Sequence, residues 1–218
     1  MFPLHGKKQA RITPYINYGL IGINVLVFLY ELSLSNAQLD QFFQLYALIP
    51  QELTASFAGV VINHPVPELA TLFTSQFLHG SFFHLISNMV FLLILGNNIE
   101  TRLGHFKYII FYLTCGVLAA LCQWFTAMDS TMPSLGASGA IFGVLGAYFI
   151  HSPRTLVRVL IGIFILKNVT SGVIDLQKAA NTTIETGGVA YWANTTGFVF
   201  GLLLYPLLGL LNNNQQQE

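Results

Sequence analysis

Six apolar segments, nearly free of charged residues, dictate what this chain can fold into. They cover approximately residues 15–35, 82–99, 106–127, 138–151, 155–174 and 190–211. About 20 apolar residues in an α-helix cross the ~30 Å hydrocarbon core of a bilayer, and a helix satisfies its own backbone hydrogen bonds in lipid. We therefore predict an all-α membrane protein built as a bundle of six transmembrane helices.

The composition agrees with a membrane protein and excludes other classes. Of the 218 residues, 54% are hydrophobic and 8% are charged, whereas soluble domains carry about 25% charged residues. The formal net charge is zero, so no electrostatic attraction to nucleic acid is expected. No motif calls for a cofactor. The expected partners are the lipid bilayer and other membrane proteins.

The basic residues suggest how the chain is oriented. With six spans, seven of them fall on one side of the membrane: Lys7, Lys8, Arg11, Arg102, Lys107, Arg154 and Arg158. Basic loops stay cytoplasmic, so both termini are expected in the cytoplasm. We expect a cytoplasmic segment at 1–14, a membrane domain at 15–211 and a polar tail at 212–218. A bacterial or cyanobacterial inner membrane fits best, and a plastid or mitochondrial origin stays open.

A long outer loop, about 36–80, connects the first two spans and contains neither Lys nor Arg. Phe42, Phe43 and Tyr46 recur in it at roughly helical spacing. This pattern predicts short amphipathic helices that lie at the membrane interface.

Ser138 stands in the run Gly136-Ala137-Ser138-Gly139, at the start of the fourth apolar segment. The first backbone N–H groups of a helix are unpaired, and they can stabilise a negative charge that develops on a reacting oxygen. The flanking glycines let another backbone approach closely. Ser138 is therefore a candidate nucleophile. The alternative is a serine that only caps the helix, with glycines for packing.

His79, His84 and Asn88 form a second polar cluster at the outer end of the second span. His84 and Asn88 are four residues apart and share one face of a helix. Polar side chains inside a membrane usually line a cavity, and these two can donate hydrogen bonds to an oxyanion. A metal site and polar helix packing are the alternatives. No carboxylate or thiolate accompanies the cluster in the sequence, so we expect no metal.

The last span carries Asn194, Gly197 and Gly201. Two glycines four residues apart form a face on which another helix can pack closely. The fourth span, with Gly139 and Gly143, is the expected partner. This packing would bring residue 194 near Ser138.

Together these motifs resemble the rhomboid family of intramembrane serine proteases. The resemblance rests on four motifs: His79 with His84-x-x-x-Asn88, Gly96-Asn97-x-Ile99-Glu100-x-Arg102-Leu103-Gly104, Gly136-x-Ser138-Gly139-x-x-Phe142-Gly143, and Gly197-x-x-x-Gly201. No single motif is specific, but the combination is, and it covers most of the chain.

The resemblance implies a function and roles for these residues. Ser138 would be the nucleophile, and His84 and Asn88 would stabilise the oxyanion together with the N–H of Ser138. Phe142 would pack against a catalytic imidazole on the last span. The substrates would be transmembrane helices of other proteins, unwound near their outer ends. The fifth span and the loop before the fourth would admit and cover them.

The chain departs from the family pattern at the catalytic histidine, where it has Asn194. An amide cannot accept a proton near neutral pH, so Ser138 lacks a general base there. Two explanations stay open: an introduced His→Asn change in a protease, or a natural pseudoprotease that binds membrane-protein clients without cleaving them. A small transporter is the rival class, but no inverted repeat supports it.

Two further departures concern other parts of the chain. Ala70-Thr71 replaces a Trp-Arg pair that is common in the outer loop of the family. Lys167 lies within the fifth span. Its stem can extend to an interface, or its amine can act as a substitute base, because burial lowers the pKa of lysine.

Overall fold

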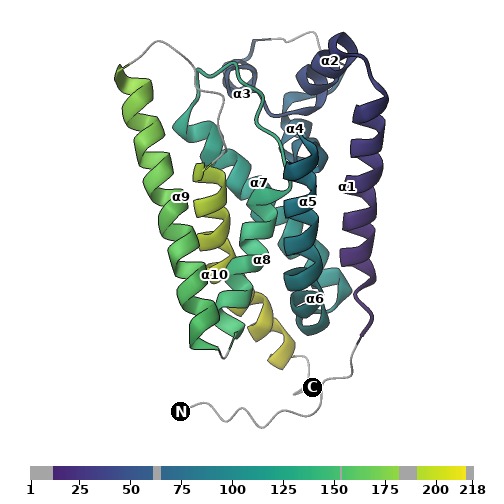
Figure 1. Cartoon of the computed structure of the whole chain (residues 1–218), viewed down its shortest axis with the longest axis vertical. Helices are drawn as coiled ribbons and strands as arrows, with labels where there is room; N and C mark the ends of the chain where they lie inside the picture. The colour runs from purple at the N-terminus through teal and green to yellow at the C-terminus, as the bar shows by residue number, and fades with distance from the viewer. Residues whose placement is uncertain (1–11, 61–64, 153, 182–190, 215–218) are drawn as a thin grey trace.

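A bundle of upright helices makes up this computed structural model, which describes residues 12–60, 65–152, 154–181 and 191–214. In Figure 1, α1 and α9 stand at opposite edges, and α7, α8 and α10 lie between them. The helices are α1 (Tyr15–Ser33), α2 (Asn36–Tyr46), α3 (Pro50–Phe57), α4 (Glu68–Thr74), α5 (Phe82–Phe91), α6 (Asn97–Leu103), α7 (His105–Thr126), α8 (Ser138–His151), α9 (Thr155–Asn181) and α10 (Tyr191–Asn214), with a 3₁₀ turn, η1 (Ser75–Phe77), and a π turn, η2 (Leu92–Gly96). The described residues are thus predominantly helical, as predicted.

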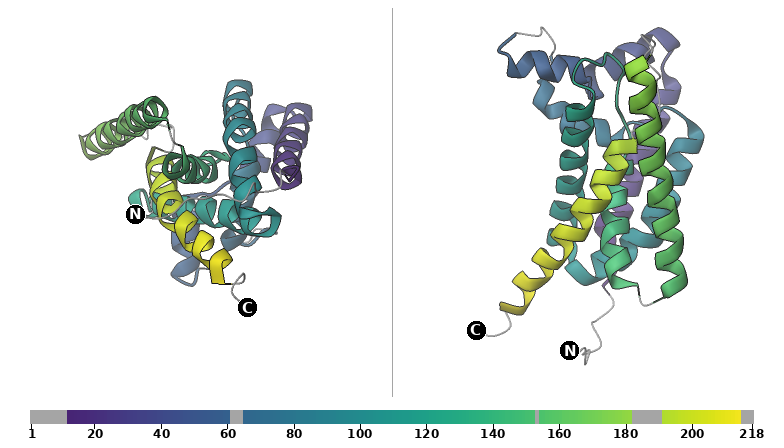
Figure 2. Two further views of the ribbon diagram at one scale, coloured as in Figure 1. Left: turned by 90° about the horizontal axis from the view of Figure 1, so that it is seen from below. Right: turned by 90° about the vertical axis from the view of Figure 1, so that its left-hand side faces the viewer.

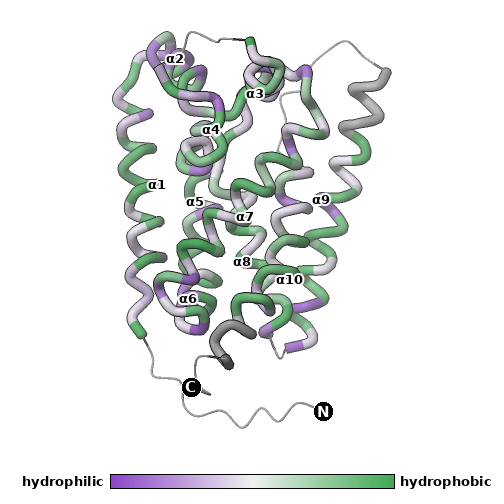
Figure 3. Tube along the Cα trace, turned by 180° about the vertical axis from the view of Figure 1, so that it is seen from behind, coloured by the Kyte–Doolittle hydropathy of each residue, from purple (hydrophilic) through white to green (hydrophobic). Residues whose placement is uncertain are grey.

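Among the described residues, four helical stretches are long and apolar enough to cross a membrane: Tyr15–Ser33, Phe82–Leu103, His105–Thr126 and Thr155–Ile174. Apolar residues run along most of the bundle (Figure 3), which indicates an integral membrane protein. The fourth predicted span, α8, has 14 residues and is only ~21 Å long. The helix α10 is not among the four candidates. The structure therefore supports four spans, and the count of six stays a prediction.

The predicted outer loop folds largely into helices, as its aromatic spacing suggested. The elements α2, α3, α4 and η1 lie between α1 and α5, and α2 and α3 lie at the end of the bundle opposite α6 (Figure 1). Ser35 and Gln38 form a capping box that begins α2. Trp124 of α7 donates from Nε1 to Thr54 Oγ1 at 2.9 Å, which ties α3 to the bundle.

The buried face of α1 carries a polar residue every seven positions. Asn17 and Asn24 are 0% exposed, and Glu31 is 3% exposed. At one end of α1, the Glu100 carboxylate accepts hydrogen bonds from the backbone N–H groups of Ile16 and Asn17, at 3.0 and 2.7 Å. This contact joins α1 to α6.

The stretch from α5 to α6 is one continuous span interrupted by the π turn η2. Gly96 ends this turn against α1 and α7. A Cβ on Gly96 would lie 2.5 Å from Tyr108 Oη and would also collide with the side chain of Asn17. Only glycine fits there, and the turn can therefore press directly against both helices.

The predicted close packing of α8 and α10 is confirmed. A Cβ on Gly197 would collide with the carbonyl oxygen of Gly139, and one on Gly201 with that of Gly143. The backbones of the two helices therefore touch. Figure 2 shows α10 running obliquely beside α9, which stands at the edge of the bundle.

Two helices extend further than predicted. The helix α9 continues to Asn181 rather than ending near 174, and α10 continues to Asn214 rather than 211. Our boundaries followed hydrophobicity, but a helix can continue with polar residues beyond an apolar stretch. The start of α1 and the end of α10 lie at the same end of the bundle (Figure 1).

Candidate functional site

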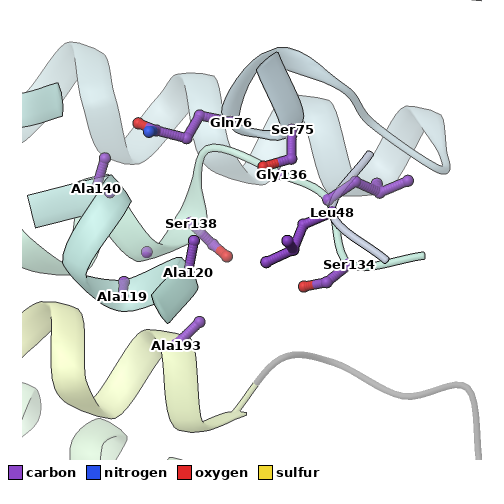
Figure 4. A pocket seen from close by; sticks show the side chains of 13 residues that line it. Leu48, Ser75, Gln76, Ala119, Ala120, Ser134, Gly136, Ser138, Ala140 and Ala193 are labelled. Carbon is purple, nitrogen blue, oxygen red and sulfur yellow. The ribbon is translucent and has the colours of Figure 1, made fainter. Parts of the chain in front are cut away.

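Ser138 is the first residue of α8 and lines a small cavity of ≈ 20 Å³. A cavity of that size holds about one water molecule. Figure 4 shows the hydroxyl groups of Ser138 and Ser134 pointing toward the same space beside Leu48. The other lining residues are Ser75, Gln76, Gly116, Ala119, Ala120, Leu135, Gly136, Gly139, Ala140 and Ala193. The candidate nucleophile is thus partly accessible and faces a partly polar cavity.

The loop before α8 is held by backbone hydrogen bonds to the segment before α5. Leu48 and Ser134 exchange two bonds, of 3.0 and 2.8 Å, and the N–H of Gly136 donates to the Ser75 carbonyl at 2.9 Å. Gly136 has φ +120°, a conformation that favours glycine. A Cβ there would also lie 2.7 Å from Cε1 of His84. The glycine therefore allows the His84 ring to lie against the loop that leads to Ser138.

His79 and Asn88 lie together beside His84, as the sequence suggested. His79 is 1% exposed, and Asn88 Nδ2 is 3.0 Å from His79 Nε2. The ring centroids of His79 and His84 are 5.1 Å apart. Burial, followed by the proximity of His84, lowers the pKa of His79 to about 4. His79 is therefore neutral near pH 7.

Glu31 of α1 joins this cluster, which sequence reasoning missed. Its Oε1 accepts a hydrogen bond from the backbone N–H of His79 at 3.2 Å, across 48 positions of the chain. The signal in the sequence was the seven-residue spacing of Asn17, Asn24 and Glu31 within an apolar helix, because such spacing places polar groups on one buried face.

The side chain of Asn194 faces α9. It is 4% exposed, and its Nδ2 donates to Asn168 Oδ1 at 3.2 Å. Asn168 in turn donates from Nδ2 to the Phe164 carbonyl at 2.9 Å. The structure records no hydrogen bond from Asn194 to Ser138. Its neighbour Ala193, rather than Asn194, lines the cavity.

Asn168 is the second residue that sequence reasoning missed. The sequence drew attention to Lys167 instead, but Lys167 lies on the exposed face of α9 and Asn168 is buried. This arrangement does not favour Lys167 as a substitute base for Ser138.

Phe142 of α8 takes part in a stack of rings that reaches α9. Its ring centroid is 5.3 Å from that of Phe164, and the planes are tilted by 28°. Phe164 also stacks on Phe91 of α5, at 6.0 Å and 10°. The aromatic partner of Phe142 is therefore Phe164 of the fifth predicted span.

No three His, Cys, Asp or Glu residues come together as a metal site within the part of the chain that the structure describes. The chemistry that the site offers is a partly buried hydroxyl at a helix start, with imidazole and amide groups nearby. This arrangement suits acyl transfer through a serine, if a base is supplied.

Comparison with known proteins identifies relatives of this chain. The family model described as "Rhomboid domain" matches residues 66–210. Rhomboid protein 1, mitochondrial, of Saccharomyces cerevisiae is 29% identical over 194 residues, which cover 85% of this chain and 51% of that protein. Rhomboid-like protein 11, chloroplastic, of Arabidopsis thaliana is 29% identical over 178 residues, which cover 78% and 60%.

The match to a human relative covers a shorter stretch of this chain. Presenilin-associated rhomboid-like protein, mitochondrial, is 31% identical over 139 residues, which cover 62% of this chain and 32% of that protein. The chain thus spans about half the length of the yeast relative. The names of these relatives place them in mitochondria or chloroplasts, which gives no support to the expected bacterial inner membrane.

Proposed function

Because the chain belongs to the rhomboid family, we propose that it carries the site of an intramembrane serine endopeptidase, disabled at one residue. Ser138 is the nucleophile of this site. The observation that carries the proposal is the cavity at the start of α8, which Ser138 and Gly136 line, together with the His84 ring that lies against Gly136. Transmembrane helices of other membrane proteins are the proposed substrates.

The proposed roles rest on the resemblance of these motifs to those of the rhomboid family. Ser138 attacks a peptide carbonyl carbon, and the charge that develops on the carbonyl oxygen is stabilised by hydrogen-bond donors. The backbone N–H of Ser138 is one donor, because the first N–H groups of a helix have no partner within it. The side chains of His84 and Asn88 are the others.

The missing element is the general base. Asn194 occupies the position that the family pattern gives to a histidine, and its amide is hydrogen-bonded to Asn168. An amide can neither accept the hydroxyl proton of Ser138 nor return it to the leaving amine. Loss of one member of such a catalytic group removes most of the rate in serine proteases. The chain as written is therefore proposed to cleave very slowly or not at all.

A second candidate function is that of a pseudoprotease which binds membrane-protein clients without cleaving them. The Asn168–Asn194 hydrogen bond favours it, because both amides are buried and the bond ties α9 to α10. In this alternative Asn194 has a structural role of its own. Six spans with both termini in the cytoplasm remain part of the proposal in either case.

The deciding experiment is cleavage of a model transmembrane substrate in detergent. Four forms are compared: the unaltered chain, Asn194→His, Asn194→His with Ser138→Ala, and Asn194→Gln as a control that changes size without supplying a base. The protease proposal expects cleavage only with Asn194→His. A gain of at least ~100-fold is expected, the low end of the contribution of general-base catalysis.

Two results would count against the proposal. Cleavage by the unaltered chain that is lost with Ser138→Ala means that another base serves Ser138. If folded Asn194→His does not cleave the substrate, and the same substrate co-purifies with the unaltered chain, the pseudoprotease is favoured.

A further inference from the structure

The buried carboxyl group of Glu31 is not explained by the proposed chemistry. Glu31 is 3% exposed and stands in α1, an apolar helix that is a candidate membrane span. An ionisable group inside a membrane is costly, so it usually has a specific partner and a functional reason. The recorded partner of the Glu31 side chain is the backbone N–H of His79.

The backbone of His79 lies outside any helix. It precedes α5, in the short segment between η1 and α5, so the hydrogen-bond ladder of a helix does not fix its backbone. The 3.2 Å bond from its N–H to Glu31 Oε1 joins this segment to α1. Its ring then meets Asn88 of α5. Glu31, His79 and Asn88 thus form a chain of contacts from one helix to another.

The hydrogen bond between His79 and Asn88 constrains the orientation of the Asn88 side-chain amide, which is a proposed oxyanion donor. An amide nitrogen only donates, so Asn88 Nδ2 gives one proton to His79 Nε2, and a neutral His79 carries its own proton on Nδ1. The second proton on Asn88 Nδ2 stays available. Because the first bond fixes the plane of the amide, it also fixes the direction in which the second proton points.

We infer that Glu31 is a positioning residue, which holds His79 so that His79 orients Asn88 as an oxyanion donor. This inference rests on the proposed function for its catalytic consequence. Its structural part, the dependence of the His79–Asn88 hydrogen bond on Glu31, is independent of cleavage. What Glu31 supplies is a hydrogen-bond acceptor for a backbone N–H, which a glutamine side chain can also provide.

The test uses three substitutions in α1. Glu31→Leu removes the acceptor at similar volume. Glu31→Gln keeps an acceptor oxygen and serves as the conservative variant. Asn24→Leu is the matched control, because Asn24 lies seven residues away on the same buried face and bonds within α1, from Nδ2 to the Leu20 carbonyl at 2.7 Å.

The first readout is the state of the His79 ring in the otherwise unaltered chain. Nitrogen NMR of ¹⁵N-histidine-labelled protein in detergent distinguishes a hydrogen-bonded acceptor Nε2 from a free one. We expect Glu31→Leu to change the Nε2 signal of His79, whereas Glu31→Gln and Asn24→Leu leave it in place. An unchanged signal in folded Glu31→Leu overturns the inference, whatever the cleavage assays show.

The second readout is cleavage in the Asn194→His background. Glu31→Leu is expected to lower kcat ~10-fold, less than the ~100-fold or more that loss of an oxyanion donor itself costs. KM should stay within about twofold, because the contact acts on the transition state. Glu31→Gln should retain the parent rate. An equal loss in Asn24→Leu, or a change confined to KM, overturns the inference in favour of general packing.

The two readouts separate two kinds of failure. If Asn194→His does not cleave, the proposed function fails, and the His79 signal still decides whether Glu31 holds His79. If Asn194→His cleaves and Glu31→Leu cleaves equally well, the proposed function stands and the role of Glu31 is refuted.

Discussion

At the scale of single residues, His79 makes the stability of the fold depend on pH. Its pKa is about 4 in the folded protein, against an ordinary value of 6.5. Between these values the unfolded chain binds a proton that the folded chain does not bind. The free energy of unfolding should therefore fall as the pH drops from about 6.5 to about 4, and it should be unaffected by His79 above that range.

The size of this effect is limited to about 3 kcal/mol, because each pKa unit corresponds to ~1.4 kcal/mol. Glu31 and His84 face His79 and titrate in their own right. The measurement is therefore the difference in thermal unfolding between the unaltered chain and His79→Gln, in detergent at several pH values from 7 to 4. His79→Gln should lose less stability on acidification. Parallel curves for the two proteins would refute the prediction.

The residues of the candidate site differ in how readily they could be predicted from the sequence. Ser138, His84 and Asn88 stand in short motifs, so the resemblance to the rhomboid family could single them out. Glu31 and Asn168 could not be assigned in this way, because their partners lie 48 and 26 positions away. Such contacts depend on how whole helices pack, which no local pattern encodes.

At the scale of helices, the contact between α8 and α10 leaves no room for a side chain. Gly197→Ala places a Cβ against the carbonyl oxygen of Gly139. Overpacking of this kind costs about 1–3 kcal/mol, and backbone atoms cannot move aside as a flexible side chain can. We expect Gly197→Ala to lower the unfolding temperature in detergent.

Gly209→Ala is the matched control for this substitution. Gly209 belongs to the same helix, and a Cβ there meets no atom within 4 Å. Alanine favours a helix over glycine by up to ~1 kcal/mol, so this variant should be as stable as the parent or more stable. Equal destabilisation by both substitutions would show that the contact between the helices does not matter.

The ends of helices could be predicted where the apolar segment and the helical backbone end at the same residue. The predicted fourth span, 138–151, agrees with α8, which begins after Gly136 and ends just before Pro153. The end of α9 was placed too early, since its apolar stretch stops while its backbone hydrogen bonds continue to Asn181.

At the scale of the whole molecule, α1 is tied to the bundle at both of its ends by a glutamate. Near the C-terminal end of α1, the Glu31 side chain accepts a hydrogen bond from the N–H of His79. At the other end, Glu100 receives two backbone N–H groups of α1 and contacts Nδ1 of His105 at 2.5 Å. Between these contacts, α1 packs mainly through apolar side chains.

The Glu100 contact is expected to carry much of this attachment. Glu100→Gln removes the charge that strengthens the hydrogen bonds to Ile16 and Asn17, and hydrogen bonds to charged groups contribute about 1.5–3 kcal/mol each. We predict a loss of about 3 kcal/mol in the free energy of unfolding, measured by denaturation in mixed micelles. Asp129→Asn, at an exposed carboxylate, should change stability by less than ~0.5 kcal/mol. Similar values for both variants would contradict the prediction.

The fold class could be predicted from the sequence because apolar length alone constrains a membrane protein so strongly. The count of six spans stays a prediction, because α8 has 14 residues and α10 is not among the candidate spans of the described residues. All residues of α8 from Gly139 to Ala147 are buried, so protein surrounds most of this helix.

The π turn η2 has a consequence for reading the sequences of relatives. It adds a residue to the span between Asn88 and Glu100, and one residue turns a helix by about 100°. A relative that crosses the same distance with an unbroken α-helix reaches the equivalent of Glu100 one residue sooner. A correct alignment of the two then needs a single gap inside the span, between residues 92 and 96.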